Sequence, residues 1–482
     1  MVHVQPPLEF IPPAFDPLVL RLTQLLLPVL LRSRTAITQI QADNVETLVD
    51  LYSQFQAGKI RFLMAFRHPN ADDPFCMANL LWDKVPQVAR QKQISLQHPI
   101  HSHFLYDRGI PLWAGAGVGW LFSRLGGIPI HRGKVDRLGL RTTRDLFVNG
   151  SLPMAAAPEG ATNNHNEIVS PLEPGIAQLG FWGVEDLLKA GRSQKVLIVP
   201  IGIQYRYIQP PWKPLEKLLN QLEADSGLRG KAGGAEEAEG AQGYQGAEGE
   251  IFIQNPKSTQ EATLYQRLYR LGEHLLCLME DFYTRFYHQT LKTATNEAGY
   301  DSVTSNQEFS TRLQALLDAA LKVAEQYFNL QPRGNFIERC RRLEQAGWDW
   351  IYREDIKNIE AIPPVERGLS DRIAEEANLR MWHMRLVETF VAVTGKYVLE
   401  KPTAERFAET TLLMWETIAR IKGSSTFPRP RLGKQQVQIT VGKPISVSDR
   451  WETYQASRRS AKQAVADLTQ DLQTALEAMI HQ

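Results

Sequence analysis

Short apolar runs separated by helix-like stretches fill the first half of the chain. The runs end in polar clusters and lie at residues 61–66, 104–106, 128–130, 152–157 and 196–204. Between two of them, residues 135–148 have a helical pattern that closes on Asn149 and Gly150. Short apolar runs that alternate with helices are typical of a mostly parallel sheet covered on both faces.

The second half has a different pattern, with apolar residues at the three-to-four spacing of helices. This spacing predicts helices at 260–291, 311–329, 333–347, 370–393 and 402–421. Residues 437–441 then alternate with period two, and a final helix is expected at about 449–480. The sequence therefore predicts an α/β fold, a mostly parallel sheet flanked by helices and interrupted by a large, mainly helical insertion.

These patterns divide the chain into segments. They are an N-terminal proline-rich segment with an apolar helix (1–54), the α/β domain (55–208), an insertion (209–433, helical across 260–421) and a closing strand with a C-terminal helix (434–482). Inside the insertion, residues 223–250 hold eight glycines, six alanines and seven acids against two bases. We expect this stretch to be disordered, because it has little apolar surface to bury.

The apolar helix expected at 15–33 has two open interpretations. Its few polar positions, Arg21, Gln24 and Arg32, fall near one narrow stripe, which is typical of a helix that lies in a membrane interface. A helix packed on the protein core would have a similar composition. No apolar run reaches the roughly 18 residues of a spanning helix, and the N-terminus lacks the features of a signal peptide. We expect a protein at the cytoplasmic face of a membrane, peripheral or monotopic.

Composition narrows the class of protein further. The 482 residues hold 54 Lys and Arg against 53 Asp and Glu, a net charge of +1, which argues against a nucleic-acid partner. The three cysteines, Cys76, Cys277 and Cys340, lie far apart and exclude both a disulfide framework and a four-cysteine zinc site. We expect Cys76 to be a small buried side chain.

The first candidate for chemistry is His68 with Asp73, directly after the apolar run at 61–66. Active groups gather beyond the carboxyl ends of strands in an open parallel sheet. A histidine there can act as a general base, and a carboxylate five residues later can hold the imidazole by its other nitrogen. The alternative is a turn in which Asp73 caps a helix that starts at Pro74.

Two further motifs combine glycine turns with charged residues. Gly127 precedes Arg132 by five residues, and Arg137, Arg141 and Arg144 follow on one helix face. Arginine binds phosphate through paired donors, although these last three would equally form a solvated basic face. The third motif is Pro158-Glu159-Gly160, in which glycine allows close approach of a ligand and glutamate accepts hydrogen bonds from a hydroxyl or holds an arginine. A fourth motif, Val199-Pro200, suggests a bulge or a strand end.

In this order the four motifs resemble those of the glycerophospholipid acyltransferase family, the 1-acylglycerol-3-phosphate acyltransferases and their relatives. That family carries His-x-x-x-x-Asp, Gly-x-x-x-x-Arg, Pro-Glu-Gly and Val-Pro motifs, and residues 441–445 are similar to its closing strand. The resemblance covers about 55–208 and 434–482. It departs in the third motif, where Ala157 replaces an aromatic residue and Ala161-Thr162-Asn163 stands where Thr-Arg-Ser is usual. The missing arginine bears on the acceptor more than on the acyl chemistry.

The resemblance implies an enzyme of phospholipid biosynthesis that moves a fatty acyl group to a lipid hydroxyl. His68 would deprotonate the acceptor and Asp73 would orient His68, whereas Gly127, Arg132, Pro158, Glu159 and Gly160 would bind the glycerol-phosphate end. The donor would be a thioester of coenzyme A or of acyl carrier protein, with no other cofactor. The favoured acceptor is 1-acylglycerol 3-phosphate, followed by glycerol 3-phosphate and then by another lipid alcohol.

Three other interpretations stay open from the sequence. A non-catalytic lipid-binding scaffold could keep the same fold, and an ester or thioester hydrolase could use the His68 and Asp73 pair on water. His98, His101 and His103 have a spacing that would suit a zinc site, but no further ligand is evident nearby. We expect no metal and a polar loop before the strand at residue 104. The oligomeric state is not indicated.

Overall fold

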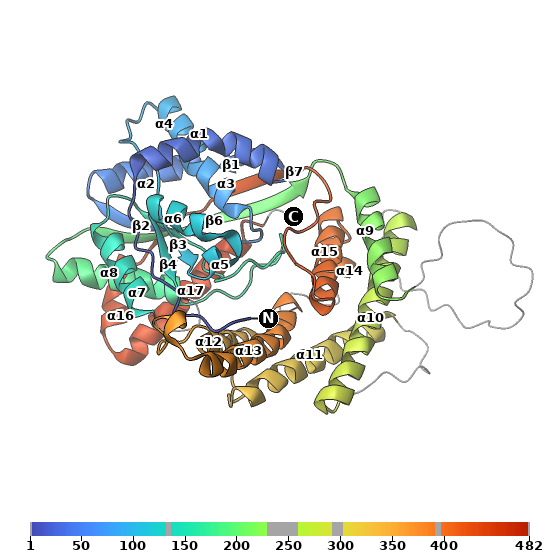
Figure 1. The fold of residues 1–482 in the computed structure, drawn as a ribbon. Coiled ribbons are helices and arrows are strands. Elements are labelled where there is room, and N and C mark those ends of the chain that lie inside the picture. The colour runs from blue at the N-terminus through green and yellow to red at the C-terminus, as the bar shows by residue number, and fades with distance from the viewer. Residues whose placement is uncertain (1, 132–135, 229–258, 292–301, 391–396, 481–482) are drawn as a thin grey trace, which may run out of the picture. The chain divides into compact units, whose positions relative to one another are not determined.

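A computed structural model describes residues 2–131, 136–228, 259–291, 302–390 and 397–480 (Figure 1). The chain divides into two compact units. The α/β unit consists of residues 8–208 and 434–482, and the helical unit consists of residues 1–7 and 209–433.

The α/β unit is built on an eight-stranded mixed sheet with the order β1-β7-β6-β2-β5-β3-β4, in which β8 also pairs with β6. The strands are β1 (Ile37–Asp43), β2 (Ile60–Phe66), β3 (His103–Asp107), β4 (Gly127–Ile130), β5 (Met154–Ala156), β6 (Lys195–Tyr207), β7 (Gln435–Val441) and β8 (Ile445–Ser446). Only the pairs that β6 makes with β7 and β8 are antiparallel among these strands. The predicted fold class, a mostly parallel sheet with a large helical insertion, is confirmed.

Helices cover both faces of this sheet. They are α1 (Pro17–Arg34), α2 (Val45–Gln56), α3 (Asp73–Asn79), the π-helical η1 (Leu80–Lys84), α4 (Val85–Gln91), α5 (Ile110–Ala114), α6 (Ala116–Arg124), α7 (Arg137–Asn149), α8 (Gly175–Lys189), η3 (Ser448–Arg450), α16 (Trp451–Gln455) and α17 (Arg458–Glu477). Side chains of β2 alternate between two apolar cores: Phe62 and Met64 pack with α2, α3 and α4, whereas Leu63 and Ala65 pack with α7, α8 and α17.

Two expectations for the α/β unit need correction. The sequence places residues 37–54 in an N-terminal segment outside the α/β domain, but residues 37–56 form β1 and α2, and β1 pairs with β7 in the main sheet. The expected helix at 449–480 is broken into η3, α16 and α17, because the chain is extended at Ser457 and the Ser457 side chain caps α17.

Helix α1 carries features of both open interpretations. Asp16 caps its start, and Leu20 and Leu27 are buried. Its opposite side exposes a stripe of apolar residues, Leu18, Leu22, Leu25, Leu26 and Val29. No helix in the described ranges has the combination of length and apolar character needed to span a bilayer.

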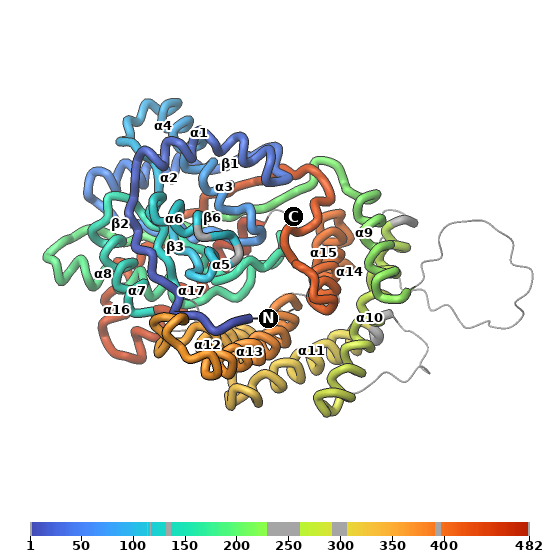
Figure 2. Tube along the Cα trace, in the orientation of Figure 1, coloured from blue at the N-terminus to red at the C-terminus, as the bar shows by residue number. Residues whose placement is uncertain are grey.

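The helical unit consists mainly of helices (Figure 2), and several of them share one apolar core. The helices are α9 (Trp212–Asp225), α10 (Thr259–Tyr287), α11 (Ser302–Tyr327), α12 (Phe336–Ile351), η2 (Ile359–Ala361), α13 (Pro364–Phe390), α14 (Tyr397–Glu400) and α15 (Ala404–Ile421). The start of the expected disordered stretch is wrong, because α9 continues to Asp225 and the buried Glu223 accepts hydrogen bonds from Arg267. The rest of that stretch, 229–250, lies outside the described residues.

Candidate active site

His68 lies two residues beyond the carboxyl end of β2, where the local backbone is held from both sides. The buried Arg67 donates hydrogen bonds to the carbonyl oxygens of His165 at 2.8 Å and Asn166 at 2.6 Å. The amide of Arg67 also bonds the Ile201 carbonyl oxygen of β6 at 2.9 Å. The end of β2 is therefore fixed to the loop that follows β5 and to β6, and this fixes the place of His68.

The imidazole of His68 is held by a buried carboxylate. Its Nδ1 lies 2.9 Å from Oδ2 of Asp73, and the same oxygen accepts a hydrogen bond from the amide of Asn70 at 2.9 Å. The Asp73 side chain is fully buried, whereas 22% of the His68 side chain is exposed. Asp73 is the first residue of α3 and does not cap it from outside. The geometry is thus that of an oriented general base with an accessible end.

Tyr205 completes this arrangement, although the sequence analysis did not identify it. Its hydroxyl donates to Oδ1 of Asp73 at 2.5 Å, and Cys76 Sγ lies 3.3 Å from the same hydroxyl. Burial is the largest cause of the raised pKa of both Tyr205 and Cys76, so both groups stay protonated at neutral pH. Cys76 is buried as expected. As a buried, protonated thiol it is a poor nucleophile.

The other nitrogen of His68 is bonded to a protein hydroxyl. Thr162 Oγ1 lies 2.9 Å from Nε2. Since Nδ1 faces the Asp73 carboxylate, Nδ1 carries the proton and Nε2 accepts one from the hydroxyl. Thr162 belongs to the segment in which the third motif departs from its usual residues. The departure from the usual residues at positions 161–163 was therefore the sequence signal that pointed to Thr162.

The carboxylate of Glu159 holds the backbone of His68 in place. Its side chain is buried and accepts hydrogen bonds from the amide of His68 at 2.8 Å, from Asn163 Nδ2 at 2.8 Å and from the amide of Ser170 at 3.0 Å. Burial raises the pKa of Glu159, and the nearby Arg67 guanidinium opposes that rise. Both carboxylate oxygens therefore hold the protein backbone and side chains around the base.

The residues on either side of Glu159 shape the same turn. The Pro158 carbonyl oxygen accepts a hydrogen bond from the Glu173 amide at 2.8 Å. Gly160 has a φ of +70°, and a Cβ there would lie 2.3 Å from Oε1 of Glu173. A larger residue at 160 would strain the backbone and displace Glu173, so this turn requires glycine.

The second motif is not brought together with His68 in the described residues. Gly127 starts β4, at the amino end of the strand, and its missing Cβ leaves room for the Phe104 ring, which a Cβ would approach to 2.8 Å. Arg132 lies outside the described residues. Arg144 is bound to Asp186 of α8 at 2.6 Å and 2.9 Å, so it joins α7 to α8, whereas Arg137 and Arg141 are exposed.

Pro200 does not mark the bulge or strand end that was expected, because it lies inside the continuous strand β6. Along one edge, β6 pairs with β8 at Leu197 and Ile198 and with β7 from Ile201 onward. Pro200 therefore stands where β6 changes partner, a position at which no backbone donor is needed on that edge.

His101 and His103 are core residues, which corrects the expected polar loop. His101 accepts from Trp82 Nε1 at 3.2 Å and donates to the Leu125 carbonyl oxygen at 2.8 Å, and burial lowers its pKa to about 4. His103 starts β3 and donates to the Gly126 carbonyl oxygen at 2.9 Å. Across the ranges that the structure describes, no group of three or more His, Cys, Asp or Glu side chains is placed to hold a metal ion.

The structure thus joins His68, Asp73 and Glu159 in one site, with Pro158 and Gly160 in its supporting turn, and adds Tyr205 and Thr162. The resulting chain of hydrogen bonds runs from a buried tyrosine through a carboxylate and an imidazole to a hydroxyl. Such a chain can remove a proton from a hydroxyl and return it to a leaving group. Comparison with family models, curated proteins and solved structures finds no match to this chain.

Proposed function

We propose that the α/β unit is an acyltransferase that moves a fatty acyl group from a thioester to the hydroxyl of a glycerolipid precursor. The observation that carries this proposal is the 2.9 Å contact between His68 Nε2 and the Thr162 hydroxyl, together with the buried Asp73 on Nδ1. The base already has a hydroxyl in the position that an acceptor hydroxyl would take. The order of the sequence motifs supports an acyl group as the one transferred.

The reaction would proceed without a covalent enzyme intermediate. The acceptor hydroxyl replaces Thr162 at Nε2 and attacks the thioester carbonyl carbon, while His68 takes its proton. The tetrahedral intermediate then breaks its carbon–sulfur bond, and the leaving thiolate receives the proton from the imidazolium. Asp73 stabilises the imidazolium between the two steps, and Tyr205 and the Asn70 amide keep Asp73 in place.

The favoured acceptor is 1-acylglycerol 3-phosphate, with glycerol 3-phosphate or another lipid alcohol as alternatives. Binding of the phosphate by Arg132 stays a prediction that rests on the sequence motif. Glu159, Pro158 and Gly160 support the site from behind His68 in this proposal, because the Glu159 oxygens are bonded to protein donors. The donor is a thioester of coenzyme A or acyl carrier protein.

The exposed apolar stripe of α1 supports a location at a membrane surface. Five apolar side chains at helical spacing, Leu18, Leu22, Leu25, Leu26 and Val29, face outward together. Such a face would enter the boundary between headgroups and acyl chains without crossing the bilayer. An acyltransferase with a lipid acceptor needs this contact, because its substrate resides in the membrane.

The decisive experiment is an acyl-transfer assay with purified full-length protein. It would offer radiolabelled acyl thioesters of coenzyme A and of acyl carrier protein against 1-acylglycerol 3-phosphate, glycerol 3-phosphate and a phosphate-free lipid alcohol. We expect His68→Ala to lower the rate by about 10²–10⁴-fold, the usual contribution of a general base. Unchanged melting would establish that the fold is kept. Equal rates for wild type and a folded His68→Ala variant would exclude the proposed mechanism.

A second candidate function is an ester or thioester hydrolase, which the contact of Thr162 with His68 also favours. Here the Thr162 oxygen would attack the acyl carbonyl carbon, His68 would pass its proton to the leaving group, and water would then cleave the acyl-threonine ester.

Thr162→Val distinguishes the two functions. Under direct transfer, loss of this hydroxyl frees Nε2, so the variant should keep at least the wild-type rate of acyl transfer. Under the hydrolase mechanism, Thr162→Val should be inactive and Thr162→Ser should keep activity. Mass spectrometry after incubation with a thioester alone would detect an acyl group on Thr162 only in the second case.

A further inference from the structure

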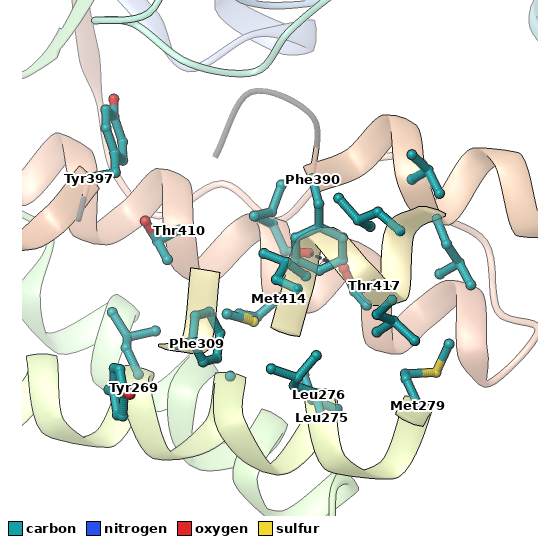
Figure 3. A pocket seen from close by; sticks show the side chains of 18 of the residues that line it. Tyr269, Leu275, Leu276, Met279, Phe309, Phe390, Tyr397, Thr410, Met414 and Thr417 are labelled. Carbon is teal, nitrogen blue, oxygen red and sulfur yellow. Dashed lines mark hydrogen bonds between the residues drawn. The ribbon is translucent and has the colours of Figure 1, made fainter. Parts of the chain in front are cut away.

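The helical unit contains an elongated apolar cavity, and none of the residues described around His68 belongs to its lining (Figure 3). The cavity lies among α10, α11, α13, α14 and α15, and all of its lining residues belong to the helical unit. Its empty volume is about 1030 Å³, which includes the solvent at its open mouth.

Among the described residues that line the cavity, none has a charged side chain. Its hydroxyl groups are bonded within the protein: Thr417 donates to the Leu413 carbonyl oxygen at 3.0 Å, and Thr410 donates to that of Arg406 at 2.8 Å. Tyr283 bonds His383 at 2.6 Å, and Tyr397 bonds Glu409 at 2.5 Å. A ligand that fits this lining is therefore uncharged along the part that lies inside.

The cavity is long in one direction. Residues of α10 that line it begin at Tyr265 and end at Tyr283, and the rise of 1.5 Å per residue places these ends about 27 Å apart. One leaflet of a bilayer has a hydrocarbon thickness of about 15 Å, which is the space taken by one acyl chain. The cavity is thus long enough for a single chain.

The middle of the cavity is lined by apolar side chains. Figure 3 places Leu275, Leu276 and Met414 between Tyr269, Thr410 and Tyr397 toward one end and Met279 and Thr417 toward the other. The hydrocarbon part of a ligand matches this apolar middle.

We propose that the helical unit binds one long, unbranched alkyl chain in this cavity, as carried by a fatty acid or by the tail of a single-chain lipid. This inference does not depend on the acyltransferase proposal, since it rests on residues of the helical unit alone. Each methylene group buried in an apolar site contributes about fourfold in affinity. Affinity for saturated fatty acids should therefore rise steeply with chain length and level off when the cavity is full.

Gly272 provides the sharpest test, because it lines the middle of the cavity on α10. The atoms nearest to a Cβ at this position would be the ends of two side chains, Met414 Cε at 3.2 Å and Phe309 Cζ at 3.5 Å. Gly272→Leu would therefore fill the cavity without forcing the backbone. Gly368→Leu is the matched control, because Gly368 is an exposed helical glycine of α13 with no atom within 4 Å of a Cβ.

The experiment measures binding of tritiated hexadecanoate to the full chain by equilibrium dialysis, below the concentration at which micelles form. We expect one bound hexadecanoate per chain, at least tenfold weaker binding to Gly272→Leu, and unchanged binding to Gly368→Leu. Octanoate should bind wild-type protein far more weakly than hexadecanoate. Ala320→Leu, which fills the same cavity from α11, serves as the second variant if Gly272→Leu does not fold.

Two outcomes would overturn the proposal. Absence of hexadecanoate binding to the folded wild type would mean that the cavity is only loose packing. Equal binding by both filling variants and the control would place the bound chain elsewhere, for example near His68. Both outcomes differ from a failure of the acyl-transfer assay, because neither requires turnover.

Discussion

The two units bury polar groups in opposite ways. In the helical unit, Arg312 bonds the buried Glu280 at 2.7 Å and 3.0 Å, and the buried Arg339 bonds Glu325 at 2.8 Å through two nitrogens. Both cations have further protein partners: Arg312 also donates to Cys277 Sγ at 3.1 Å, and Arg339 also donates to Asp318 at 2.6 Å. In the α/β unit, the hydrogen bonds that begin at Tyr205 lead through Asp73 to His68, whose side chain is partly exposed.

This difference distinguishes buried polar groups that only hold the fold together from those that can take part in a reaction. A buried ion pair whose donors and acceptors are all used has no group left for a substrate, so it holds helices together. A chain of hydrogen bonds that ends at an accessible imidazole can pass a proton to a bound molecule. Apolar surface differs less sharply. The helical unit encloses an apolar cavity, and each unit exposes an apolar stripe, on α1 in the α/β unit and on α13 in the helical unit.

The largest expected effect on stability comes from removing the cation of one of these buried ion pairs. Arg339→Met would leave Glu325 buried without its cation, which typically costs about 3–5 kcal/mol. We expect the first unfolding transition in urea to move to lower concentration, followed through helix content by circular dichroism. Acyl transfer should persist wherever the variant is folded.

The control for Arg339→Met is Arg285→Met, which removes an exposed pair with Asp281 on α10. Exposed ion pairs contribute about 0–1 kcal/mol, so this variant should unfold like wild type. If Arg339→Met were equally harmless, the buried pairs would not hold the helical unit.

A smaller effect is expected on acidification, which should lower the stability of both units. Burial lowers the pKa of His101 to about 4 in the α/β unit and that of His383 to about 3 in the helical unit. Between pH 6.5 and 4 the unfolded chain binds protons that these folded histidines do not, so stability falls as pH falls. For His101 the loss between pH 7 and pH 5 is about 2 kcal/mol.

The measurement is the free energy of unfolding at pH 7 and pH 5 for His101→Gln and for the control His98→Gln, an exposed histidine of the same segment. His101→Gln should lose less stability on acidification than wild type, whatever its stability at pH 7. His98→Gln should lose as much free energy of unfolding between pH 7 and pH 5 as the wild type. Identical slopes for all three proteins would rule out His101 as an acid-sensitive group.

The smallest effect on folding is expected where the apolar side chains already face solvent. Replacing Leu22, Leu26 and Val29 of α1 by serine should change melting little, because all three are exposed. It should lower binding to phosphatidylcholine–phosphatidylglycerol vesicles by more than tenfold, since each apolar side chain contributes about 1.5–3 kcal/mol when fully buried. Sedimentation with vesicles measures this binding.

The matched control replaces Val365, Leu369 and Ile373, an exposed apolar stripe with similar spacing on α13. Its vesicle binding should equal that of wild type. If the α13 variant were released and the α1 variant were retained, the membrane contact would belong to the helical unit. If wild-type protein failed to sediment, neither stripe would be a membrane surface.

The sequence predicts features that depend on neighbouring residues. The strands at 61–66 and 196–204 are visible because their apolar runs are continuous, and His68 with Asp73 is visible because both lie in one turn. Tyr205 is 132 residues from Asp73, and nothing in its local pattern distinguishes it from a core tyrosine. Its role depends on β6 lying beside β2, which only the folded sheet provides.

Other differences also arise from distant partners. Strand β1 was missed because its inward and outward residues do not alternate clearly, and its main stabilisation comes from pairing with β7. Glu159 was expected to accept a hydrogen bond from a ligand hydroxyl or to hold an arginine, and its hydrogen-bond partners are the His68 amide and residues of the following loop. A carboxylate in a turn has the same sequence pattern in either case, so burial alone distinguishes them.

The place where the insertion leaves and rejoins the sheet has a consequence for how the chain folds. Tyr207 at the end of β6 pairs with Gln435 at the start of β7, and the Ile208 amide bonds the Lys434 carbonyl oxygen at 3.0 Å. While the insertion is unfolded, these neighbouring strands must meet across a long unstructured segment, which costs chain entropy. A helical unit that folds early would bring its two ends together and turn the pairing of β6 with β7 into a nearly local event. Early folding of the insertion would then promote formation of the sheet that carries His68.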